Sequence, residues 1–560
     1  MTASARRGIG GLVRRPGAIL VVVVVLLAVL PFGLAPYALG VVALGLVYGL
    51  FTYGLDLSWG RVGLISVGQA AFFGLGAYAL TIGVSLGVPW VLAAALGVVF
   101  AAGIAGLIAQ IALAVKGETA VPLFILFTLG ISQLLQRVAT SMPEVTGGSN
   151  GMVAPTLDLV PTYYLVLAVT VIVVGLTFRF FVAGRRGAFQ LAVLVNPARA
   201  EHLGISVRGT QTAAFMISAA VSAVAGALFA PVAGLVTPAT LGLALSTSVL
   251  TWLAVGGKGS LIGPFLGAVL LTVAAQTLGR TWQSWYVFGL AALFILVVRF
   301  APGGVAGGAR RLLFGRSEVL RVPSARPVRR PSVPPPTDAP LLQVEGVDQR
   351  FGRSSVLQDI SLTVRSGQCV ALIGPNGAGK STLLSVIAGL LRPSAGRVLL
   401  RGEDVTLYGV DRRARLGIGR LFQVPSVFTA LAVADNLTLA ALSGGSADRA
   451  PADARLAGEL SMAERRHLEL DMVLRGPSDL VLLDEPAAGL SHADARALAQ
   501  RLRRVVEDTG CGMVVVEHDM EIVREIADRV VVLSNGAIIA SGTMDEIVAH
   551  DAVRHAYLGS

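Results

Sequence analysis

The first half of the chain is a series of long apolar stretches separated by short polar breaks. Only sixteen charged residues occur from Pro16 to Arg299. Several apolar runs approach the roughly 20 residues that a helix needs to cross a bilayer. The pairs of runs that meet around Gly33 and Gly259 are also compatible with re-entrant segments. The pattern predicts ten membrane-spanning helices, over residues 17–34, 36–55, 64–84, 89–115, 119–138, 161–181, 211–233, 240–256, 262–279 and 284–300.

Basic residues at the ends of these spans predict the orientation, because loops rich in Lys and Arg remain in the cytoplasm. Arginines before residue 16 place the N-terminus inside, and ten crossings place the C-terminal half inside as well. Only Arg137 and Arg280 fall near the outer side. A cleaved signal peptide over residues 1–31 is the alternative, but no small-residue cleavage site precedes a soluble domain. The basic positions expected inside are Arg6, Arg7, Arg14, Arg15, Arg61, Lys116, the loop 179–208, Lys258 and Arg310–Arg311.

The pattern changes after Gly308, where a proline- and arginine-rich stretch shows no periodicity that would bury one face. Prolines favour an extended spacer, so residues 311–340 are expected to form a linker. Its arginines also suit an anionic lipid surface. From Leu341 onward, strand-like runs alternate with helical ones, which is typical of an α/β domain with a mainly parallel sheet. The expected organisation is a polytopic α-helical membrane domain over residues 1–310, the linker, and an α/β domain over residues 341–560.

Composition supports a membrane protein and argues against a nucleic-acid partner. Hydrophobic residues make up 54% of the 560 positions and charged residues only 14%, against about 25% charged residues in soluble domains. The net charge is +11, but no basic face or RNA- or DNA-binding motif accompanies it. Cys369 and Cys511 are interpreted as small core residues, because two distant cysteines make neither a disulfide framework nor a metal site.

The sequence CVALIGPNGAGKSTLLSVIAGL contains an apolar run, Cys369–Ile373, then a glycine-rich turn and a helix that ends near Gly389. This is the context that a phosphate-binding loop requires. Glycines let backbone N–H groups approach phosphates, and the helix N-terminus adds partial positive charge. Lys380 is expected to reach the outer phosphates, and the Ser381 hydroxyl to hold Mg2+. The expected ATP-binding residues of the loop are Gly374, Asn376, Gly377, Gly379, Lys380, Ser381 and Thr382.

Two further apolar strands end in residues that suit hydrolysis. DLVLLDEP delivers Asp484, expected to position Mg2+ through water, and Glu485, expected to act as the general base. VVVEHD delivers His518 from a strand expected in the same sheet. The other histidines, His202 and His467 among them, are interpreted as surface or core residues. Glu485 and His518 are therefore the candidate catalytic residues.

The order of the phosphate loop, LFQ, LLDEP, AAGLS and VVEHD resembles the ATP-binding cassette (ABC) ATPases over about residues 341–560. The resemblance implies that Gln423 senses Mg2+ and the transport domain, and that His518 contacts the γ-phosphate. It also implies that Phe351, expected in a loop before the first cassette strand, stacks on adenine. A core role is the alternative for Phe351. DEPAAGL is particularly similar to the branched-chain amino acid importers.

The membrane half resembles the permease subunit of the same importers. GLISVGQAAFFGLGAYAL at 63–80, VTGGSNGM at 145–152 and LAVGGKGSLIGPFLGA at 253–268 carry this resemblance. NPARAEHLGI at 196–205 is similar to the cytoplasmic coupling segment, with Glu201 and Gly204 at its acidic and glycine positions. Pro197 and His202 depart from the usual pattern. The resemblance implies that this segment docks near Gln423 and that the chain is a permease–ATPase fusion.

The membrane half also contains polar candidates of its own. Ser66-Val67-Gly68 is a candidate unwound point that lines a substrate path. Asp56, Glu118 and Arg137 lie in or near apolar spans and are functional candidates. Interfacial placement or pairing between helices explains these three charged residues equally well.

Two Leu-Ser pairs compete for the signature turn of the resembled family, which lies about twenty residues before the strand-end aspartate. In LSMAE, Glu464 lies twenty residues before Asp484, whereas Ser446 of LSGGS at 442–446 lies thirty-eight before it. Ser461 and Glu464 also form the pattern of a capping box. The turn is therefore assigned to 460–464, with Ser461, Ala463 and Glu464 as site residues. Ala463 stands in place of a glycine, which predicts one slow ATP site in an asymmetric pair.

The leading functional hypothesis is ATP-driven import of branched-chain amino acids or similar small polar solutes across a bacterial cytoplasmic membrane, with the ATPase domain cytoplasmic. The expected cofactors are ATP and Mg2+, with Ser381, Gln423 and Asp484 around the metal. The expected partners are an extracytoplasmic solute-binding protein and a second permease and ATPase, or a second copy. Import of urea or amides, an exporter, and a nucleotide-sensing component with weak or no ATPase activity are the alternatives.

Overall fold

The computed structural model describes residues 16–115, 120–281, 283–300, 303–308, 322, 340–444, 453–476, 478–551 and 553. Glu118, His555, the N-terminal arginines and nearly all of the expected linker lie outside these residues. The chain forms two compact units, one of residues 1–182 and 208–317 and the other of residues 183–207 and 318–560. The segment 183–207, which lies between two apolar helices in the sequence, therefore belongs to the cassette unit.

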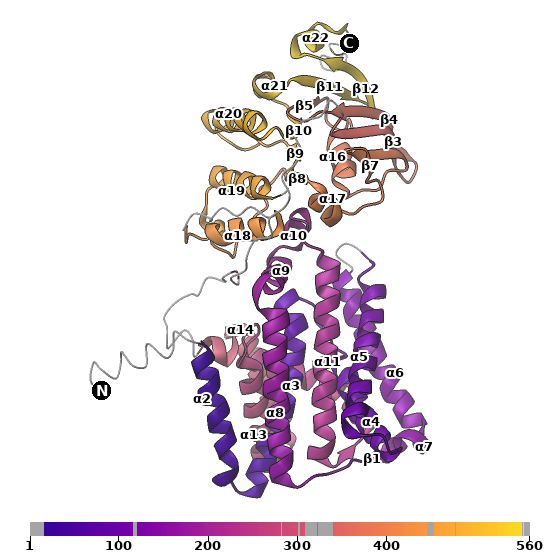
Figure 1. Ribbon diagram of the computed structural model, residues 1–560, viewed down its shortest axis with the longest axis vertical. Helices are drawn as coiled ribbons and strands as arrows, with labels where there is room; N and C mark the ends of the chain where they lie inside the picture. Colours follow the sequence, from indigo (N-terminus) through magenta and orange to yellow (C-terminus); the bar gives the residue numbers. More distant parts are fainter. Residues whose placement is uncertain are drawn as a thin grey trace, which may run out of the picture. The chain divides into compact units, whose positions relative to one another are not determined.

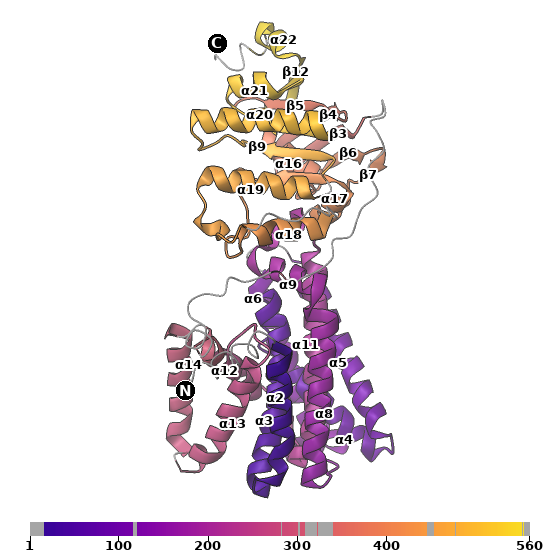
Figure 2. The same ribbon diagram turned by 60° about the vertical axis from the view of Figure 1, so that its left-hand side comes forward.

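The first unit is helical, and each of the ten expected spans overlaps a helix (Figures 1 and 2). The long helix α3 packs against both α8 and α13. A two-stranded antiparallel pair joins β1 (Met152–Val153) to β2 (Leu235–Val236). The main helices are α2 (Pro16–Val29), α3 (Pro36–Val62), α4 (Gln69–Ser85), α5 (Trp90–Ala112), α6 (Ala120–Ser141), α7 (Pro143–Thr146), α8 (Leu159–Thr177), α11 (Val207–Ala233), α12 (Leu243–Gly256), α13 (Gly263–Thr281) and α14 (Gln283–Phe300).

Five helices among the described residues are long and apolar enough to cross a membrane: α3, α5, α6, α8 with its continuation to Val182, and α11. Others are shorter than a full span. At 1.5 Å per residue, the 14 residues of α12 extend about 21 Å, less than the roughly 30 Å hydrocarbon core. The α-helix within the expected span 240–256 is thus too short to cross the hydrocarbon core by itself. The chain is also non-helical from Gly63 to Gly68, between α3 and α4, which confirms the predicted unwound point.

The second unit contains a six-stranded sheet in the order β12-β11-β5-β10-β9-β8. All neighbours are parallel except β12, which pairs antiparallel with β11. The mainly parallel sheet expected from the sequence is confirmed. The strands are β5 (Cys369–Ile373), β8 (Ile418–Leu421), β9 (Leu480–Asp484), β10 (Gly512–Val516), β11 (Arg529–Ser534) and β12 (Ala537–Gly542).

A second, antiparallel sheet has the order β4-β3-β6-β7 and was not expected from the sequence. Its long strands bury only alternate positions, so they lack the continuous apolar runs of the parallel sheet. The strands are β3 (Leu342–Phe351), β4 (Ser354–Val364), β6 (Ala395–Leu400) and β7 (Glu403–Asp404). The helices of this unit are α9 (Gly184–Val195), α10 (Pro197–His202), α16 (Lys380–Ala388), α17 (Val410–Leu416), α18 (Val433–Gly444), α19 (Met462–Arg475), α20 (His492–Thr509), α21 (Met520–Ile526) and α22 (Met544–Ala549).

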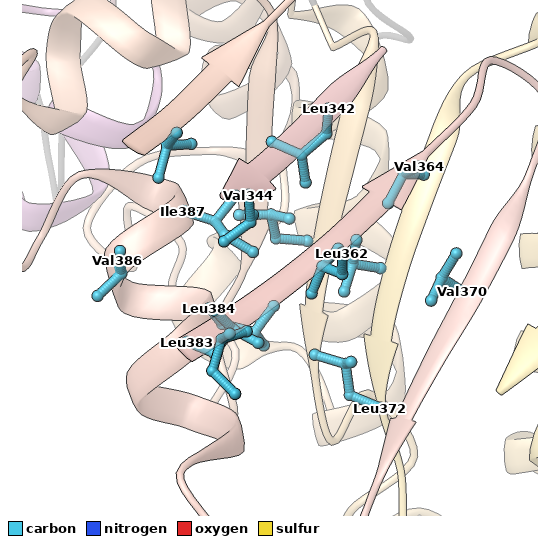
Figure 3. Close-up of a cluster of buried hydrophobic side chains, with 14 of the residues drawn as sticks. Leu342, Val344, Leu362, Val364, Val370, Leu372, Leu383, Leu384, Val386 and Ile387 are labelled. Atoms are coloured by element: carbon cyan, nitrogen blue, oxygen red, sulfur yellow. The ribbon is translucent and has the colours of Figure 1, made fainter. Parts of the chain in front are cut away.

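Helix α16 is anchored between the two sheets by an apolar cluster (Figure 3). Leu383, Leu384, Val386 and Ile387 are fully buried on this helix. They pack with side chains of β3, β4 and β5 in one core. Each such side chain contributes about 1.5–3 kcal/mol when it is fully buried. The core therefore fixes the start of α16, where the glycine-rich turn ends.

Candidate ATP-binding and coupling sites

The parallel sheet brings the predicted nucleotide residues to one edge. Strands β5, β10 and β9 are adjacent in that order, so their carboxyl ends meet at the same edge, where α/β sheets bind ligands. The glycine-rich turn follows β5, Glu485 follows β9, and His518 lies two residues beyond β10. A pocket at this edge is lined by Val356, Asn376, Gly377, Ala378, Gly379, Lys380, Ser381, Thr382, Glu485 and His518.

The turn before α16 leaves the helix N-terminus open. Gly379 is the capping residue and has a left-handed φ of 100°, and no side chain caps the helix. Lys380 folds back over the turn, and its Nζ donates to the carbonyl oxygens of Gly374 at 2.8 Å and Pro375 at 3.0 Å. Burial lowers the pKa of Lys380, while Glu485 and Asp484 act in the opposite direction. The turn thus presents backbone donors and a cation to an anionic ligand.

Asp484 ends β9 as a buried carboxylate with two partners. The Ser381 hydroxyl donates to its Oδ1 at 3.2 Å. The Arg420 guanidinium lies 3.5 Å from its Oδ2, and both side chains are about 8% exposed. Arg420 was not predicted as a site residue, although it lies only three positions before Gln423 in the LFQ segment.

Glu485 lies between the other two predicted residues of the catalytic group. Gln423 Nε2 donates to its Oε2 at 2.9 Å, and His518 Nε2 lies 2.9 Å from its Oε1. Its backbone has a φ of 47°, a conformation rare for a side-chain-bearing residue. Strained backbone of this kind concentrates at functional sites.

Glu517 supports this group and was missed by sequence reasoning. Its carboxylate accepts the N–H groups of Ala487 at 2.9 Å and His518 at 3.2 Å. Burial raises the pKa of Glu517, and these two hydrogen bonds oppose the rise. The signal in the sequence is its place directly before His518 at the end of an apolar strand.

Phe351 is not in a loop before the first cassette strand, as the sequence analysis expected. It is the last residue of β3 and pairs with Ser354 of β4 at the hairpin end. The side chain is 49% exposed, so the alternative of a core residue is wrong. Phe351 is not among the described residues that line the pocket at the glycine-rich turn.

The segment 196–205 lies against the cassette close to Gln423, as expected. Asn196 caps α10 by accepting the N–H of Arg199 at 3.0 Å. Its Nδ2 also donates to Ser426 Oγ at 3.2 Å and to the carbonyl oxygen of Val427 at 3.4 Å. The His202 ring packs edge-on against Phe422, with centroids 4.6 Å apart. Burial lowers the pKa of His202 to about 3, so this ring is neutral at ordinary pH.

Gly204 occupies a position that excludes a side chain. Its φ is 80°, and an added Cβ would lie 2.9 Å from Arg415 Cγ. Its carbonyl oxygen accepts a hydrogen bond from Arg415 Nη1 at 2.8 Å. Glu201, the other predicted residue of this segment, is half-buried in α10. Arg199, which the sequence analysis did not select, is fully buried.

The predicted capping box at Ser461 is confirmed. The Ser461 side chain accepts the N–H of Glu464, and Glu464 Oε2 accepts the N–H of Ser461 at 2.9 Å. Arg455 Nη1 donates to the other oxygen of Glu464 at 2.8 Å. These hydrogen bonds lower the pKa of Glu464. Ala463 is half-buried in the first turn of the helix.

The competing sequence, LSGGS, begins inside a helix. Leu442, Ser443 and Gly444 form the end of α18, and Gly445 and Ser446 lie outside the described residues. A Cβ at Gly444 would lie 2.4 Å from Gly476 Cα, so close packing against the end of α19 accounts for this glycine.

The first unit buries a polar cluster beside its unwound segment. Gln69 Nε2 donates to Ser218 Oγ at 3.0 Å and to Ser222 Oγ at 2.7 Å. Gln69 Oε1 and Ser66 Oγ are buried without a hydrogen-bond partner among the described residues. Asp56 is also fully buried, and its Oδ1 accepts the N–H of Gly259 at 2.7 Å. Arg137 is exposed on α6.

Comparisons with known proteins match both halves. The family model for the permease component of branched-chain amino acid transport systems matches residues 37–298, and the ABC transporter model matches residues 357–488. LptB, a lipopolysaccharide export ATP-binding protein of Acidithiobacillus ferridurans, is 34% identical over 39% of this chain and 97% of its own. CysA 2, a sulfate/thiosulfate import ATP-binding protein of Rhizobium meliloti, is 35% identical over 37% of this chain and 61% of its own.

Among solved structures, a nucleotide-free ATP-binding cassette from an ABC transporter is similar to this chain. It covers 40% of this chain and 100% of its own, with 26% identity and a TM-score of 0.36. The chain belongs to the ABC transporter family, and it joins a permease component of the branched-chain amino acid transport type to an ATP-hydrolysing cassette in one polypeptide.

Proposed function

We propose that this chain is a subunit of a bacterial importer that uses ATP hydrolysis to move branched-chain amino acids, or similarly small polar solutes, across the cytoplasmic membrane. The match of residues 37–298 to the branched-chain amino acid permease component supports the substrate class. The cassette does not narrow the substrate class, because relatives of the cassette are named for lipopolysaccharide export and for sulfate/thiosulfate import. Urea and amides are the alternative substrates.

The observation that carries the catalytic proposal is the position of Glu485 between Gln423 and His518 at the phosphate pocket. In this proposal Glu485 is the general base for the attacking water, and His518 contacts the γ-phosphate. Lys380 binds the outer phosphates, and the N–H groups of the turn hold the remaining phosphate oxygens. Phe351, exposed at the end of β3, stacks on the adenine.

Ser381, Asp484 and Gln423 are the proposed Mg2+ ligands, directly or through water. Their side-chain oxygens suit this cation, and Ser381 Oγ lies 3.2 Å from Asp484 Oδ1. No group of three or more His, Cys, Asp or Glu residues that could hold a metal occurs among the described residues. The bound cation neutralises charge on the phosphates.

A complete transporter needs a second cassette and a second permease, or a second copy of this chain, and an extracytoplasmic solute-binding protein. In the assembled pair, the turn at Ser461 closes the ATP site of the partner cassette. Ala463 places a methyl group where the family has a glycine, and Glu464 adds a carboxylate near a phosphate site. When the partner is a different cassette with an intact signature turn, the site that uses Lys380 and Glu485 is competent, and the site closed by Ser461 is slow.

Glu201 and Gly204 are proposed to pass ATP-driven movement to the membrane helices. The packing of Gly204 on Arg415 supports this role, because a side chain would push α10 away from α17. Gly204→Ala is expected to lower uptake while ATP binding persists. Cysteine pairs that join 196–205 to 422–427 should cross-link, and failure across several pairs would contradict the docking.

Uptake into proteoliposomes tests the proposed function. The assembled transporter, with ATP on the cassette side and the binding protein outside, should accumulate labelled leucine, isoleucine or valine. Glu485→Gln should abolish this uptake, and labelled urea and acetamide should enter poorly. Preferential urea or acetamide uptake would move the substrate to the alternative class, and ATP-dependent efflux would reverse the direction.

A second candidate function is that of a nucleotide-sensing component with weak or no ATPase activity. The altered turn with Ala463 and Glu464 is the observation that favours it. ATP hydrolysis by the purified complex, with and without binding protein, separates the two functions. Stimulated hydrolysis supports the importer, and ATP binding without hydrolysis supports the sensor.

A further inference from the structure

A buried cluster of three charged side chains lies where segment 183–207 meets the cassette. Arg199 of α10 and Glu469 of α19 are both fully buried, and Arg199 Nη1 lies 3.6 Å from Glu469 Oε1. Arg466 of α19 donates from Nη1 to the other carboxylate oxygen of Glu469 at 2.9 Å. Buried charges of this kind are tolerated only when they are paired and hydrogen-bonded. The cluster therefore depends on all three members.

The same cluster holds the backbone around Gln423. Glu469 Oε1 accepts the N–H groups of Phe422 and Ser426, each at 3.2 Å. Arg466 donates to the carbonyl oxygens of Phe422 at 2.5 Å and Gln423 at 2.6 Å. The segment 422–426 is thus fixed to α19 by two side chains, and its Gln423 side chain reaches Glu485 at 2.9 Å.

Arg199 is the member of the cluster that lies outside residues 341–560. Its guanidinium donates to the carbonyl oxygen of Arg420 at 3.1 Å and to that of Glu469 at 3.3 Å. It therefore joins β8, just before the Gln423 segment, to α19. A lysine ammonium lacks the planar fork that makes these contacts together.

We propose that Arg199 is a positioning residue for ATP hydrolysis, which supplies the second positive charge to Glu469 and so fixes segment 422–426 with Gln423 on Glu485. The inference rests on the proposed role of Glu485 and adds a route by which segment 183–207 regulates that site. Displacement of α10 withdraws the charge and releases the backbone that holds Gln423.

The titration of Glu469 gives this role a distinctive signature. Burial raises the pKa of Glu469, and Arg199, Arg466 and the N–H groups of Phe422 and Ser426 lower it. On the neighbouring strand, Arg420 lies close by with its guanidinium paired to Asp484. Without Arg199 the pKa of Glu469 rises further, and a protonated carboxyl accepts the two N–H groups less strongly. As the pH is lowered, a variant without Arg199 should therefore lose ATPase activity at a higher pH than the wild type does.

The test uses the full chain in its assembled transporter and compares Arg199→Ala, Arg199→Lys, Glu469→Gln and the double variant Arg199→Ala/Glu469→Gln. Arg412→Ala is the matched control, because Arg412 is an exposed arginine on α17 that packs on Tyr408.

Arg199→Ala should lower kcat by about 10- to 100-fold, the range expected for a displaced catalytic group, with KM for ATP unchanged. Arg199→Lys should be intermediate. The acid limb of kcat should move to higher pH in Arg199→Ala and lose that shift in the double variant.

Wild-type kcat and pH profile in Arg199→Ala would overturn the inference, as would an equal loss in Arg412→Ala or a large change in KM. If Arg199→Ala does not fold, Arg199→Lys decides: reduced kcat at normal KM supports the inference, and wild-type kcat overturns it. Glu485→Gln is measured in parallel. Normal hydrolysis in that variant would refute the proposed base, whereas the kcat and pH effects at Arg199 are judged separately.

Discussion

At the N-terminus of α16 the capping residue is a glycine, no side chain closes the helix, and Lys380 curls over the open turn. At the N-terminus of α19 a serine caps the helix, Glu464 accepts the N–H of that serine, and Arg455 holds the glutamate in turn. In the proposed function, both helix starts lie near a phosphate of bound ATP. The N-terminus of α16, the open start, offers free backbone donors and a cation. The N-terminus of α19, the closed start, uses its first backbone donors within the chain. The two capping residues differ in backbone conformation, left-handed at Gly379 and extended at Ser461, and only the second helix start satisfies its first donors with side chains of its own chain.

The largest effect should come from removing the proposed base at the open start. Glu485→Gln keeps the shape of the side chain and its contact with Gln423 but cannot accept a proton. ATP hydrolysis should fall by about 10²–10⁴-fold, the contribution of a positioned base, while nucleotide binding persists. Turnover and equilibrium binding measured on the same preparation check this. Hydrolysis at the wild-type rate would end the assignment.

Gly379→Ala attacks the open start directly. The φ of 100° is unfavourable for alanine, and the added Cβ would lie 2.7 Å from Leu357 Cδ2 and 2.9 Å from the carbonyl oxygen of Val356. A strained backbone of this kind costs about 1–3 kcal/mol, so both stability and ATP affinity should fall. Thermal unfolding with and without ATP measures the two effects. Gly377→Ala is a comparison for the contacts alone, because its φ of 82° is also unfavourable for alanine but nothing lies within 4 Å of its added Cβ.

The opposite substitution, Ala463→Gly at the N-terminus of α19, should lower the stability of the helix and raise the rate of ATP hydrolysis at the slow site. Glycine in a helix interior costs up to about 1 kcal/mol relative to alanine, but it removes the methyl group from the proposed phosphate approach. The slow site should speed up, which single-turnover hydrolysis resolves as a faster second phase. An unchanged second phase would mean that Ala463 is not what limits that site.

The sequence was most informative where an apolar strand is followed directly by candidate functional residues, and where a helix begins with a capping pattern. The apolar run Cys369–Ile373 matches β5 residue for residue, and the capping box at Ser461 was read from two side chains three positions apart. Contacts between segments that are distant in the sequence were harder to predict. Arg199 and Glu469 are 270 positions apart in the chain, and no local pattern marks either as buried. The antiparallel sheet and the strand position of Phe351 were also missed, because half-buried strands carry weaker signals than buried ones.

A smaller, pH-dependent effect should distinguish the closed start. Hydrogen bonds from Ser461 and Arg455 lower the pKa of Glu464, so its folded value lies below its unfolded value. The stability it contributes is present above the unfolded pKa, about 4.3, and is lost as the pH falls through the folded pKa. Urea unfolding should show Glu464→Gln as less stable than the wild type by a similar amount from pH 7 down to about pH 4.3, and the gap should narrow as the pH falls further toward the lowered folded pKa. A gap that stays constant below that pH would show that charge plays no part in the cap.

The smallest expected effect is the most diagnostic for the closed start. If the site closed by Ser461 is slow because of Ala463 and Glu464, then Ser461→Arg blocks a site that contributes little, and total turnover should hardly change. Stability should still fall by about 1 kcal/mol, because a serine cap is lost. An unfolding measurement on the same sample shows that the substitution has taken effect. Silencing of the complex by Ser461→Arg would mean that the closed start serves an active site. Because Gly444 is packed against Gly476, loss of turnover in Gly445→Arg with normal stability would instead move the signature to LSGGS.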